Sequence, residues 1–358
     1  MQTILITGGA GFIGSNFIQY FLKNNEDVIV VNLDLLTYAG NLNNLQEVEN
    51  HNRYTFIKGD ICDRDLIETL FNKYNFNGVI HFAAESHVDN SIKYPDIFIK
   101  TNVFGTFNLL DVARNHWMKN PNEYKEGYIN SRFHHISTDE VYGTLGETGL
   151  FSEKTSYAPN SPYSASKASS DFMVRSYFHT YGLNVITTNC SNNYGPKQHD
   201  EKLIPTIIRK AISGENIPIY GDGKNIRDWL YVLDHCKGID IVYHNGVTAN
   251  TYNIGGRNER TNLQIVDSIC SILDKKVPSK TLSSYKELIT FVEDRAGHDL
   301  RYAIDASKVK RELGWEPSIT FEIGLERTID WYLSNETWLN NVTSGSYQNY
   351  YQSQYEQR

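Results

Sequence analysis

Two groups of residues in this chain have the types and spacing that proton chemistry needs. Tyr163 and Lys167 stand four positions apart, so on a helix they share one face. A free tyrosine is a poor base at neutral pH because its pKa is about 10, but nearby positive charges favour the phenolate. The pair therefore predicts a base beside a nicotinamide, where it removes a proton from a hydroxyl group.

An adjacent pair of acids, Asp139 and Glu140, follows Thr138 at the end of an expected strand over 132–137. Open parallel sheets bind their ligands at this edge. Two neighbouring acids usually form a solvated turn, but different surroundings can separate their pKa values into an acid and a base. We predict that they add proton chemistry that a simple alcohol dehydrogenase does not need.

A glycine-rich turn joins an apolar run over 3–7 to a helical pattern over 12–24. Gly8, Gly11 and Gly14 have the spacing of a dinucleotide-binding turn. Such a turn lets the backbone approach a pyrophosphate, whose charge is stabilised at the helix N-terminus. The turn therefore predicts a dinucleotide cofactor.

The choice of cofactor depends on Asp34, twenty positions beyond the last glycine of the turn. A carboxylate there accepts hydrogen bonds from ribose hydroxyls and repels a 2′-phosphate, which favours NAD over NADP. Thr37 lies close by. Asp60 ends the third expected strand, where it can meet the adenine amine, and the small side chains of Ala83 and Ala84 end the fourth.

Strands and helices alternate through the first half of the chain. This rhythm predicts an α/β fold, a Rossmann-type doubly wound parallel sheet with a smaller C-terminal α/β substrate-binding lobe. The stretch 118–131 is polar and is expected to be a loop. The expected strands are 3–7, 28–33, 54–58, 78–82, 132–137 and 184–189, and the expected helices are 12–24, 63–74, 96–116 and 162–181.

The rhythm loosens after about residue 190, where proline and glycine divide the chain into short pieces. We expect an NAD-binding domain over 1–190, to which later segments return, and a smaller second lobe over 191–333, to which the family resemblance assigns the nucleotide-sugar site. A polar, aromatic tail occupies 334–358.

Composition excludes several classes of function. The net charge is −8, with no basic run that could neutralise phosphates, so nucleic-acid binding is not expected. The four cysteines form no zinc pattern, and no metal is expected. No signal peptide or membrane-spanning segment is recognisable, which predicts a cytoplasmic protein.

Longer motifs resemble the extended short-chain dehydrogenase/reductase family and, within it, the nucleotide-sugar dehydratases. They cover nearly the whole chain, and the Asp139-Glu140 pair distinguishes them from epimerases of the same fold. The matching segments are 8–15, 34–41, 82–89, 137–143, 163–167, 189–196, 201–205, 220–223, 227–230 and 294–299.

The resemblance implies a 4,6-dehydration of a hexose carried on a nucleotide, with NAD recycled in each turnover. Tyr163 takes the C4 hydroxyl proton and Thr138 holds the C4 oxygen, while Lys167 favours the phenolate and holds the nicotinamide ribose. Glu140 abstracts the C5 proton and Asp139 protonates the C6 hydroxyl. The product is the 4-keto-6-deoxy sugar nucleotide.

The resemblance also implies two sets of binding residues and a homodimer that pairs the helices over 96–116 and 162–181. The cofactor set is Gly8, Gly11, Phe12, Ile13, Gly14, Asp34, Leu35, Thr37, Asp60, Ile61, Ala83, Ala84, Ser86, Thr101, Tyr163, Lys167 and Asn193. The substrate set is Ser86, Thr138, Asn192, Lys202, Leu203, Pro218, Tyr220, Arg227, Asn262, Arg295 and His298.

The expected substrate is dTDP-glucose, and alternatives stay open. A dehydratase acting on UDP-glucose or another nucleotide hexose is the first, a nucleotide-sugar 4-epimerase the second, and a non-catalytic NAD-binding protein the third. The chain departs from the family pattern at Lys197, His199, Asp200, Leu233 and Ala296. These positions lie near the nucleotide-sugar lobe, so they bear on the substrate more than on the reaction.

Overall fold

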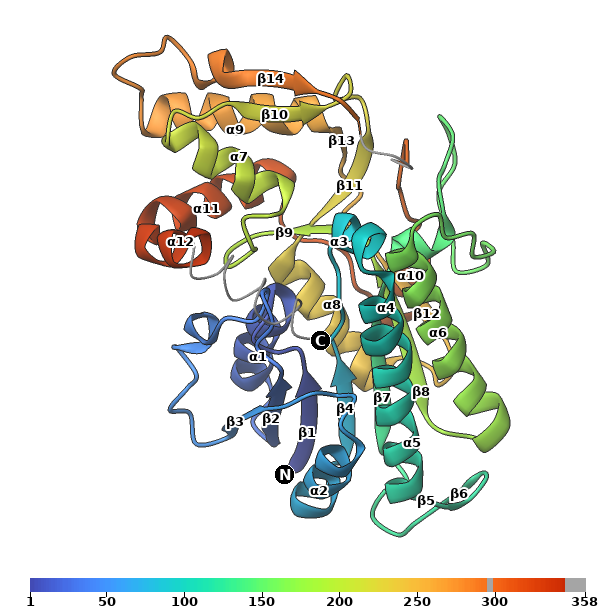
Figure 1. Cartoon of the computed structure of the whole chain (residues 1–358). Helices are drawn as coiled ribbons and strands as arrows, with labels where there is room; N and C mark the ends of the chain where they lie inside the picture. Colours follow the sequence, from blue (N-terminus) through green and yellow to red (C-terminus); the bar gives the residue numbers. More distant parts are fainter. Residues whose placement is uncertain (295–298, 345–358) are drawn as a thin grey trace.

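A seven-stranded parallel sheet forms the centre of the protein, seen here in a computed structural model that describes residues 1–294 and 299–344 (Figure 1). The strand order is β12-β8-β7-β4-β1-β2-β3, and each neighbouring pair is parallel. The predicted fold class is confirmed. The strands are β1 (Gln2–Thr7), β2 (Val28–Asp34), β3 (Tyr54–Lys58), β4 (Gly78–His81), β7 (Arg132–Thr138), β8 (Val185–Cys190) and β12 (Thr251–Ile254).

Helices cover both faces of this sheet because alternate side chains of each strand point to opposite sides. Ile4 and Ile6 pack into one core with α1 (Phe12–Asn24) and α8 (Val232–Asn245). Leu5 packs into a separate core on the other face. The helices of that second core are α2 (Arg64–Tyr74), α5 (Thr106–Trp117) and α6 (Pro162–Tyr181).

The expected helix over 96–116 is interrupted by a wider turn. α4 (Pro95–Phe98) leads into η2 (Ile99–Gly105), which is π-helical, and then into α5. A short helix, α3 (Val88–Lys93), precedes them. Single π turns inside α-helices often occur at functional sites.

The stretch 118–131, expected to be a loop, contains a small antiparallel hairpin. It consists of β5 (Met118–Asn120) and β6 (Glu123–Tyr124). Its strands are only two or three residues long, so no alternation of apolar residues predicts them.

A second group of elements has a core of its own around α7 (Leu203–Ile212), α9 (Asn262–Lys276), α11 (Phe321–Ser334) and α12 (Glu336–Thr343). Its strands are β9 (Asn192–Tyr194), β11 (Ile226–Tyr231) and β13 (Glu259–Thr261) in one sheet and β10 (Ile217–Tyr220) and β14 (Ile289–Val292) in another. Shorter elements are η1 (Leu42–Leu45), η3 (Asp139–Tyr142), η4 (Tyr285–Leu288) and α10 (Ser307–Leu313).

Three elements that follow residue 190 join the first sheet or pack on its core: β12, α8 and α10. β12 pairs with β8, and α8 packs against α1. The division at 190 and 333 stays a prediction. Within the described part of the chain, no helix combines the length and the apolar character that crossing a membrane needs.

Candidate active site

The carboxyl ends of the central strands border a cavity of about 320 Å³. All residues predicted to bind the cofactor line this cavity, which brings the glycine turn and the end of β7 to one place. They are Gly8, Gly11, Phe12, Ile13, Gly14, Asp34, Leu35, Thr37, Asp60, Ile61, Ala83, Ala84, Ser86, Thr101, Tyr163, Lys167 and Asn193.

The glycine turn leaves no room for a Cβ at two of its glycines and a tight but less crowded space at the third. Gly8 has a φ of +71°, and a Cβ on it would lie 2.6 Å from the backbone nitrogen of Ala83. A Cβ on Gly14 would lie 2.4 Å from the Gly8 carbonyl oxygen. At Gly11 the nearest atom would be 3.3 Å away, and no side chain caps the α1 N-terminus there. The helix end is therefore open to a pyrophosphate.

Asp34 ties the end of β2 to this turn. Its Oδ2 accepts the Ala10 N–H at 2.9 Å, and its Oδ1 accepts the Leu36 N–H at 2.8 Å. Burial raises the pKa of this carboxyl, while the two N–H groups oppose the rise. Each oxygen keeps a further lone pair, so the carboxylate fits ribose hydroxyls and repels a 2′-phosphate. The open turn and this carboxylate together fit NAD.

Tyr163 lies in the first turn of α6, and the helix start fixes its position. Ser161 forms a capping box with Ser164, and Pro162 occupies the first helical position. Burial raises the pKa of Tyr163 well above its usual range, the charge of Glu140 adds to the rise, and a hydrogen bond with Thr138 opposes it. The phenol therefore needs added positive charge to become a base.

Lys167 is buried under the same cavity wall, one turn further along α6. Its Nζ donates to the Ile136 carbonyl oxygen at 2.8 Å and lies 3.5 Å from His135 Nε2. Burial lowers the pKa of Lys167 to about 8, and the charge of Asp171 opposes this fall. The ammonium can thus supply part of the positive charge that Tyr163 needs.

The two acids after β7 have different surroundings. Asp139 is only 2% exposed, and within the described residues its Oδ2 has no hydrogen-bond partner. Burial raises the pKa of Asp139 well above its usual range, and the charge of Glu140 raises it further. Asp139 thus tends to keep its proton. Glu140 also lines the cavity and is partly exposed.

The π-helical turn η2 holds several cavity residues together. Asn102 accepts the Glu85 N–H at 2.8 Å and donates to Ser166 Oγ at 2.8 Å. This links the end of β4 to α6, next to Thr101. Polar cavity residues that the sequence analysis did not assign are Glu85, Ser137, Ser191, Gln198, His199 and Glu201. No spacing rule marks them; a position beside a recognised motif is their only signal.

The predicted substrate residues divide into three groups. Ser86, Thr138, Asn192 and Lys202 line the cavity, and Arg295 and His298 lie outside the described residues. The cavity wall does not include Leu203, Pro218, Tyr220, Arg227 or Asn262.

Arg227 is the predicted diphosphate ligand with the clearest structural surroundings. It is 9% exposed, and its guanidinium lies 4.4 Å from the centre of the Tyr302 ring. It donates to the carbonyl oxygens of Ile226 at 2.7 Å and Asp299 at 3.0 Å. Its positive charge lowers the pKa of Asp139, which places it near that carboxyl. Its role towards a diphosphate stays a prediction.

Comparison with known proteins agrees with this site. A family model described as GDP-mannose 4,6 dehydratase matches residues 5–328. The dTDP-glucose 4,6-dehydratase of Xanthomonas campestris pv. campestris is 55% identical over 347 residues, which cover 97% of each chain. The chain belongs to the dTDP-glucose 4,6-dehydratase family.

Solved dTDP-glucose 4,6-dehydratases have the same fold. The Bacillus anthracis enzyme in complex with NAD superposes with a TM-score of 0.83 at 45% identity, covering 96% of this chain and 100% of that one. The Streptomyces venezuelae enzyme, with NAD and the ligand TYD bound, has a TM-score of 0.86 at 42% identity and the same coverage. The predicted family resemblance is confirmed.

Proposed function

We propose that the protein converts dTDP-glucose into dTDP-4-keto-6-deoxyglucose and water, with NAD as a recycled cofactor. The observation that carries this function is the pair Asp139 and Glu140 at the end of β7, in the same cavity as Tyr163 and Lys167. Oxidation of an alcohol needs only the second pair. Removal of water also needs an acid and a base, and the buried Asp139 is suited to be the acid.

The first step oxidises C4. Tyr163, with Lys167 beside it, takes the proton of the C4 hydroxyl, and Thr138 donates a hydrogen bond to the C4 oxygen. NAD, when bound, would accept the hydride from C4, and its reduced form would donate a hydride to C6. Lys202, Ser86 and the open end of α1 contribute polar groups around this cavity.

The second step removes water. The C4 ketone acidifies the C5 hydrogen, Glu140 takes this proton, and Asp139 gives its proton to the leaving C6 hydroxyl. Glu140 then returns a proton to C5 as C6 is reduced. After one turnover Tyr163 holds the proton from the C4 hydroxyl and Asp139 lacks one, so one proton must return from Tyr163 to Asp139, directly or through water.

The decisive test is to incubate the protein with dTDP-glucose or UDP-glucose, with and without added NAD, and to follow each sugar nucleotide by mass spectrometry. Faster loss of one water from dTDP-glucose, without net NADH, supports the proposal. Faster loss from UDP-glucose overturns the substrate and keeps the reaction. If neither sugar nucleotide loses water with NAD supplied, the epimerase and the non-catalytic alternatives are favoured over a dehydratase.

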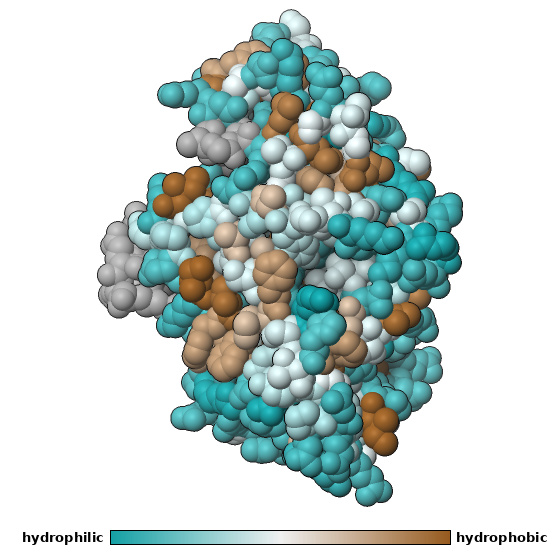
Figure 2. All heavy atoms as spheres, turned by 90° about the vertical axis from the view of Figure 1, so that its right-hand side faces the viewer, coloured by the Kyte–Doolittle hydropathy of each residue, from teal (hydrophilic) through white to brown (hydrophobic). Residues whose placement is uncertain are grey.

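The proposal includes a homodimer formed through the helical face that carries η2 and α6. Ile99 and Phe104 on η2 are 52% and 48% exposed, and Phe172 on α6 is 57% exposed. This side of the molecule faces the viewer in Figure 2, where brown patches interrupt the hydrophilic surface. Exposed apolar side chains on neighbouring helices favour a protein interface. A cytoplasmic location also stays part of the proposal.

A further inference from the structure

A buried group of polar side chains lies behind Lys167, on the side away from the reacting atoms. His135 Nε2 lies 3.5 Å from Lys167 Nζ and 3.1 Å from Asp171 Oδ1. The other carboxylate oxygen of Asp171 accepts hydrogen bonds from Ser137 Oγ and the Tyr157 hydroxyl, each at 2.9 Å. One nitrogen of the imidazole thus lies close to both an ammonium and a carboxylate.

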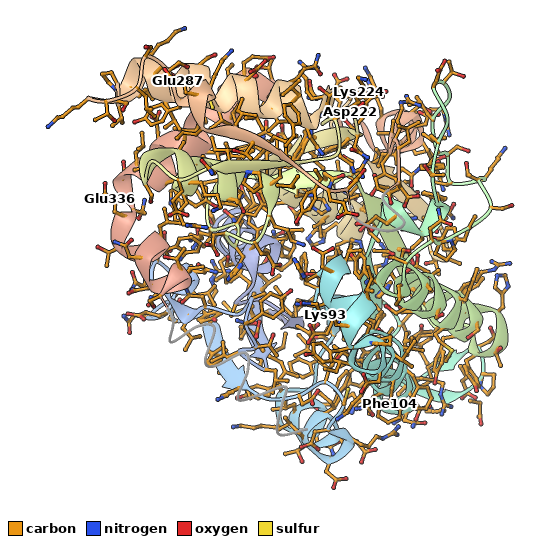
Figure 3. The ribbon with its side chains drawn as sticks, turned by 45° about the horizontal axis from the view of Figure 1, so that its top comes forward. Lys93, Phe104, Asp222, Lys224, Glu287 and Glu336 are labelled. Carbon is orange, nitrogen blue, oxygen red and sulfur yellow. The ribbon has the colours of Figure 1, made fainter. Side chains whose placement is uncertain are left out.

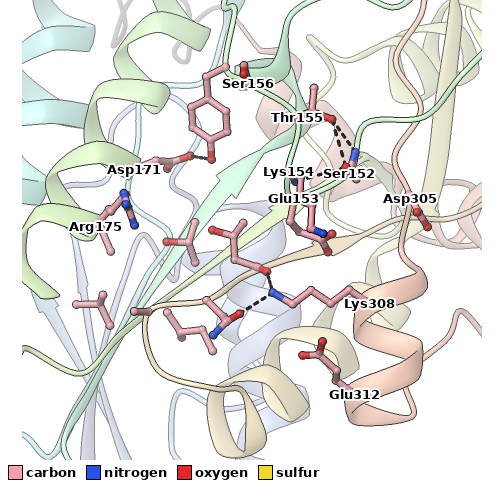
Figure 4. Close-up of a pocket in the computed structure, with 18 of the residues that line it drawn as sticks. Ser152, Glu153, Lys154, Thr155, Ser156, Asp171, Arg175, Asp305, Lys308 and Glu312 are labelled. Atoms are coloured by element: carbon pink, nitrogen blue, oxygen red, sulfur yellow. Dashed lines mark hydrogen bonds between the residues drawn. The ribbon is translucent and has the colours of Figure 1, made fainter. Parts of the chain in front are cut away.

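A second cavity, of about 840 Å³, reaches this group from behind (Figure 4). Asp171 and Tyr157 both line it, together with Glu153 and Lys308. Figure 4 shows Asp171 joined to a tyrosine hydroxyl at one side of the cavity. Lys167 lines the cavity of the candidate active site. Asp171 therefore connects the second, rear cavity to the surroundings of Lys167.

A buried ammonium is costly unless an opposite charge lies close to it. The groups that act on Lys167 are Asp171, which raises its pKa, and Cys190, which does so less. Burial raises the pKa of the Cys190 thiol to about 12, so this group is neutral near pH 7. His135 is also neutral, because burial and the charge of Lys167 lower its pKa well below the usual range.

Asp171 itself is ionised near neutral pH. Burial raises its pKa to about 6, and Lys167 and the hydroxyls of Ser137 and Tyr157 limit the rise. On the β4 side, burial keeps His81 neutral by lowering its pKa. On α6, burial raises the pKa of Tyr163, so this phenol is uncharged unless a positive group acts on it. Asp171 thus remains as the negative charge that faces Lys167.

We propose that Asp171, acting across His135, is the counter-ion that keeps Lys167 protonated and thereby supports the Tyr163 base. Asp171 is a positioning residue: it does not line the cavity of the candidate active site and acts through Lys167. The inference rests on the proposed function, because it assigns a further residue to the same proton transfer.

The first test is Asp171→Asn, which keeps the shape of the side chain and removes its charge. Without that charge the pKa of Lys167 falls, so the ammonium is lost at a lower pH. We expect the alkaline limb of kcat against pH to move about one pH unit towards acid, and kcat at pH 8 to fall about fivefold. KM for the sugar nucleotide and NAD retention should change little.

Glu153→Gln is the matched control. Glu153 is a carboxylate of the same rear cavity that accepts the Asn253 N–H at 2.9 Å. Its substitution should leave the pH profile in place. An alkaline limb in Asp171→Asn that coincides with that of the wild type overturns the proposal. A wild type that removes no water from any sugar nucleotide instead overturns the proposed function.

A second variant covers the case in which Asp171→Asn does not fold. Asp171→Ala opens a space next to the rear cavity, which a small anion can enter. Formate should then restore kcat at least about threefold more than neutral formamide at equal concentration, because only formate replaces the lost charge. Equal effects of the two, or no effect of either, contradict a role for the charge.

Discussion

Asp139 and Glu140 are consecutive residues, yet burial gives them different chemistry. Asp139 has a buried oxygen with no hydrogen-bond partner among the described residues and a raised pKa, whereas Glu140 is partly exposed to the cavity. In the proposed mechanism, the acid is Asp139, the group for which ionisation is costly. The proposed base is Glu140, the group that stays partly exposed to the cavity.

This division of roles predicts opposite isotope results for two variants in D₂O. Asp139→Asn should still exchange the C5 hydrogen of the oxidised sugar, because Glu140 is intact, while water loss falls about a hundredfold or more. Recovered dTDP-glucose should then carry one deuterium, seen by mass spectrometry. Glu140→Gln should lose water equally slowly and return dTDP-glucose without deuterium. Deuterium in both recovered substrates would contradict the assignment.

Asp139 should also lower the stability of the folded protein at neutral pH. A carboxyl whose pKa is raised by folding stabilises the fold below its unfolded pKa, about 4, and loses that stabilisation as pH rises through its folded pKa. Asp139→Asn should therefore melt a few degrees higher than the wild type at pH 7 to 8 and equally at pH 4. Differential scanning fluorimetry across this range measures the difference. If the two melting temperatures differed by the same amount at every pH, ionisation of Asp139 would not be the cause of the difference.

At the scale of the elements, we expect substitutions at two glycines of the turn to have different effects, one on folding and one on cofactor binding. Gly8→Ala places a Cβ 2.6 Å from backbone at a φ of +71°, so we expect a loss of about 2 kcal/mol or more in unfolding free energy. Gly11→Ala has its nearest atom at 3.3 Å and should fold. Its methyl group reduces the space left for the cofactor in the cavity, so NAD binding should weaken about tenfold.

Denaturant melting and NAD titration separate these two effects. Gly146→Ala is the control, because nothing lies within 4 Å of a Cβ there. It should change neither quantity. A Gly11→Ala protein that binds NAD as the wild type does would show that the turn does not approach the pyrophosphate.

Strands and helices could be predicted from the sequence where apolar residues follow one period. β3 and α6 begin and end at the expected residues. The π turn η2 could not be predicted, because an α-helix and a π turn use the same residue types. Asp171 could not be assigned either: its place four residues after Lys167 is visible, but the contact with His135 comes from β7, far away in the chain.

At the scale of the whole molecule, the chain leaves the first sheet and returns to it more than once. β12 and α8 return to the first sheet after β9 has started the second group. Tyr142, after β7, donates to Asn253 of β12 at 2.9 Å. The acids after β7 are therefore anchored to a strand that is about a hundred residues distant in the chain. Local sequence patterns do not encode such a contact.

The exposed apolar face provides the last prediction. Phe104, which Figure 3 labels on its helix, is 48% exposed, and η2 also carries Thr101 of the cavity. If a second copy covers this face, Phe104→Lys buries a charge in the interface and should cost about 2 kcal/mol or more of association. Light scattering should then change from twice the chain mass to 41.0 kDa.

Phe291→Lys is the matched control for this experiment. Phe291 is 57% exposed on β14, in the second group of elements, and its substitution should leave the dimer intact. Because η2 lines the cavity, the Phe104→Lys monomer should also bind NAD more weakly, whereas Phe291→Lys should not. A wild type that scatters as a 41.0 kDa particle at micromolar concentration would contradict the dimer. Equal dissociation of both variants would place the interface elsewhere.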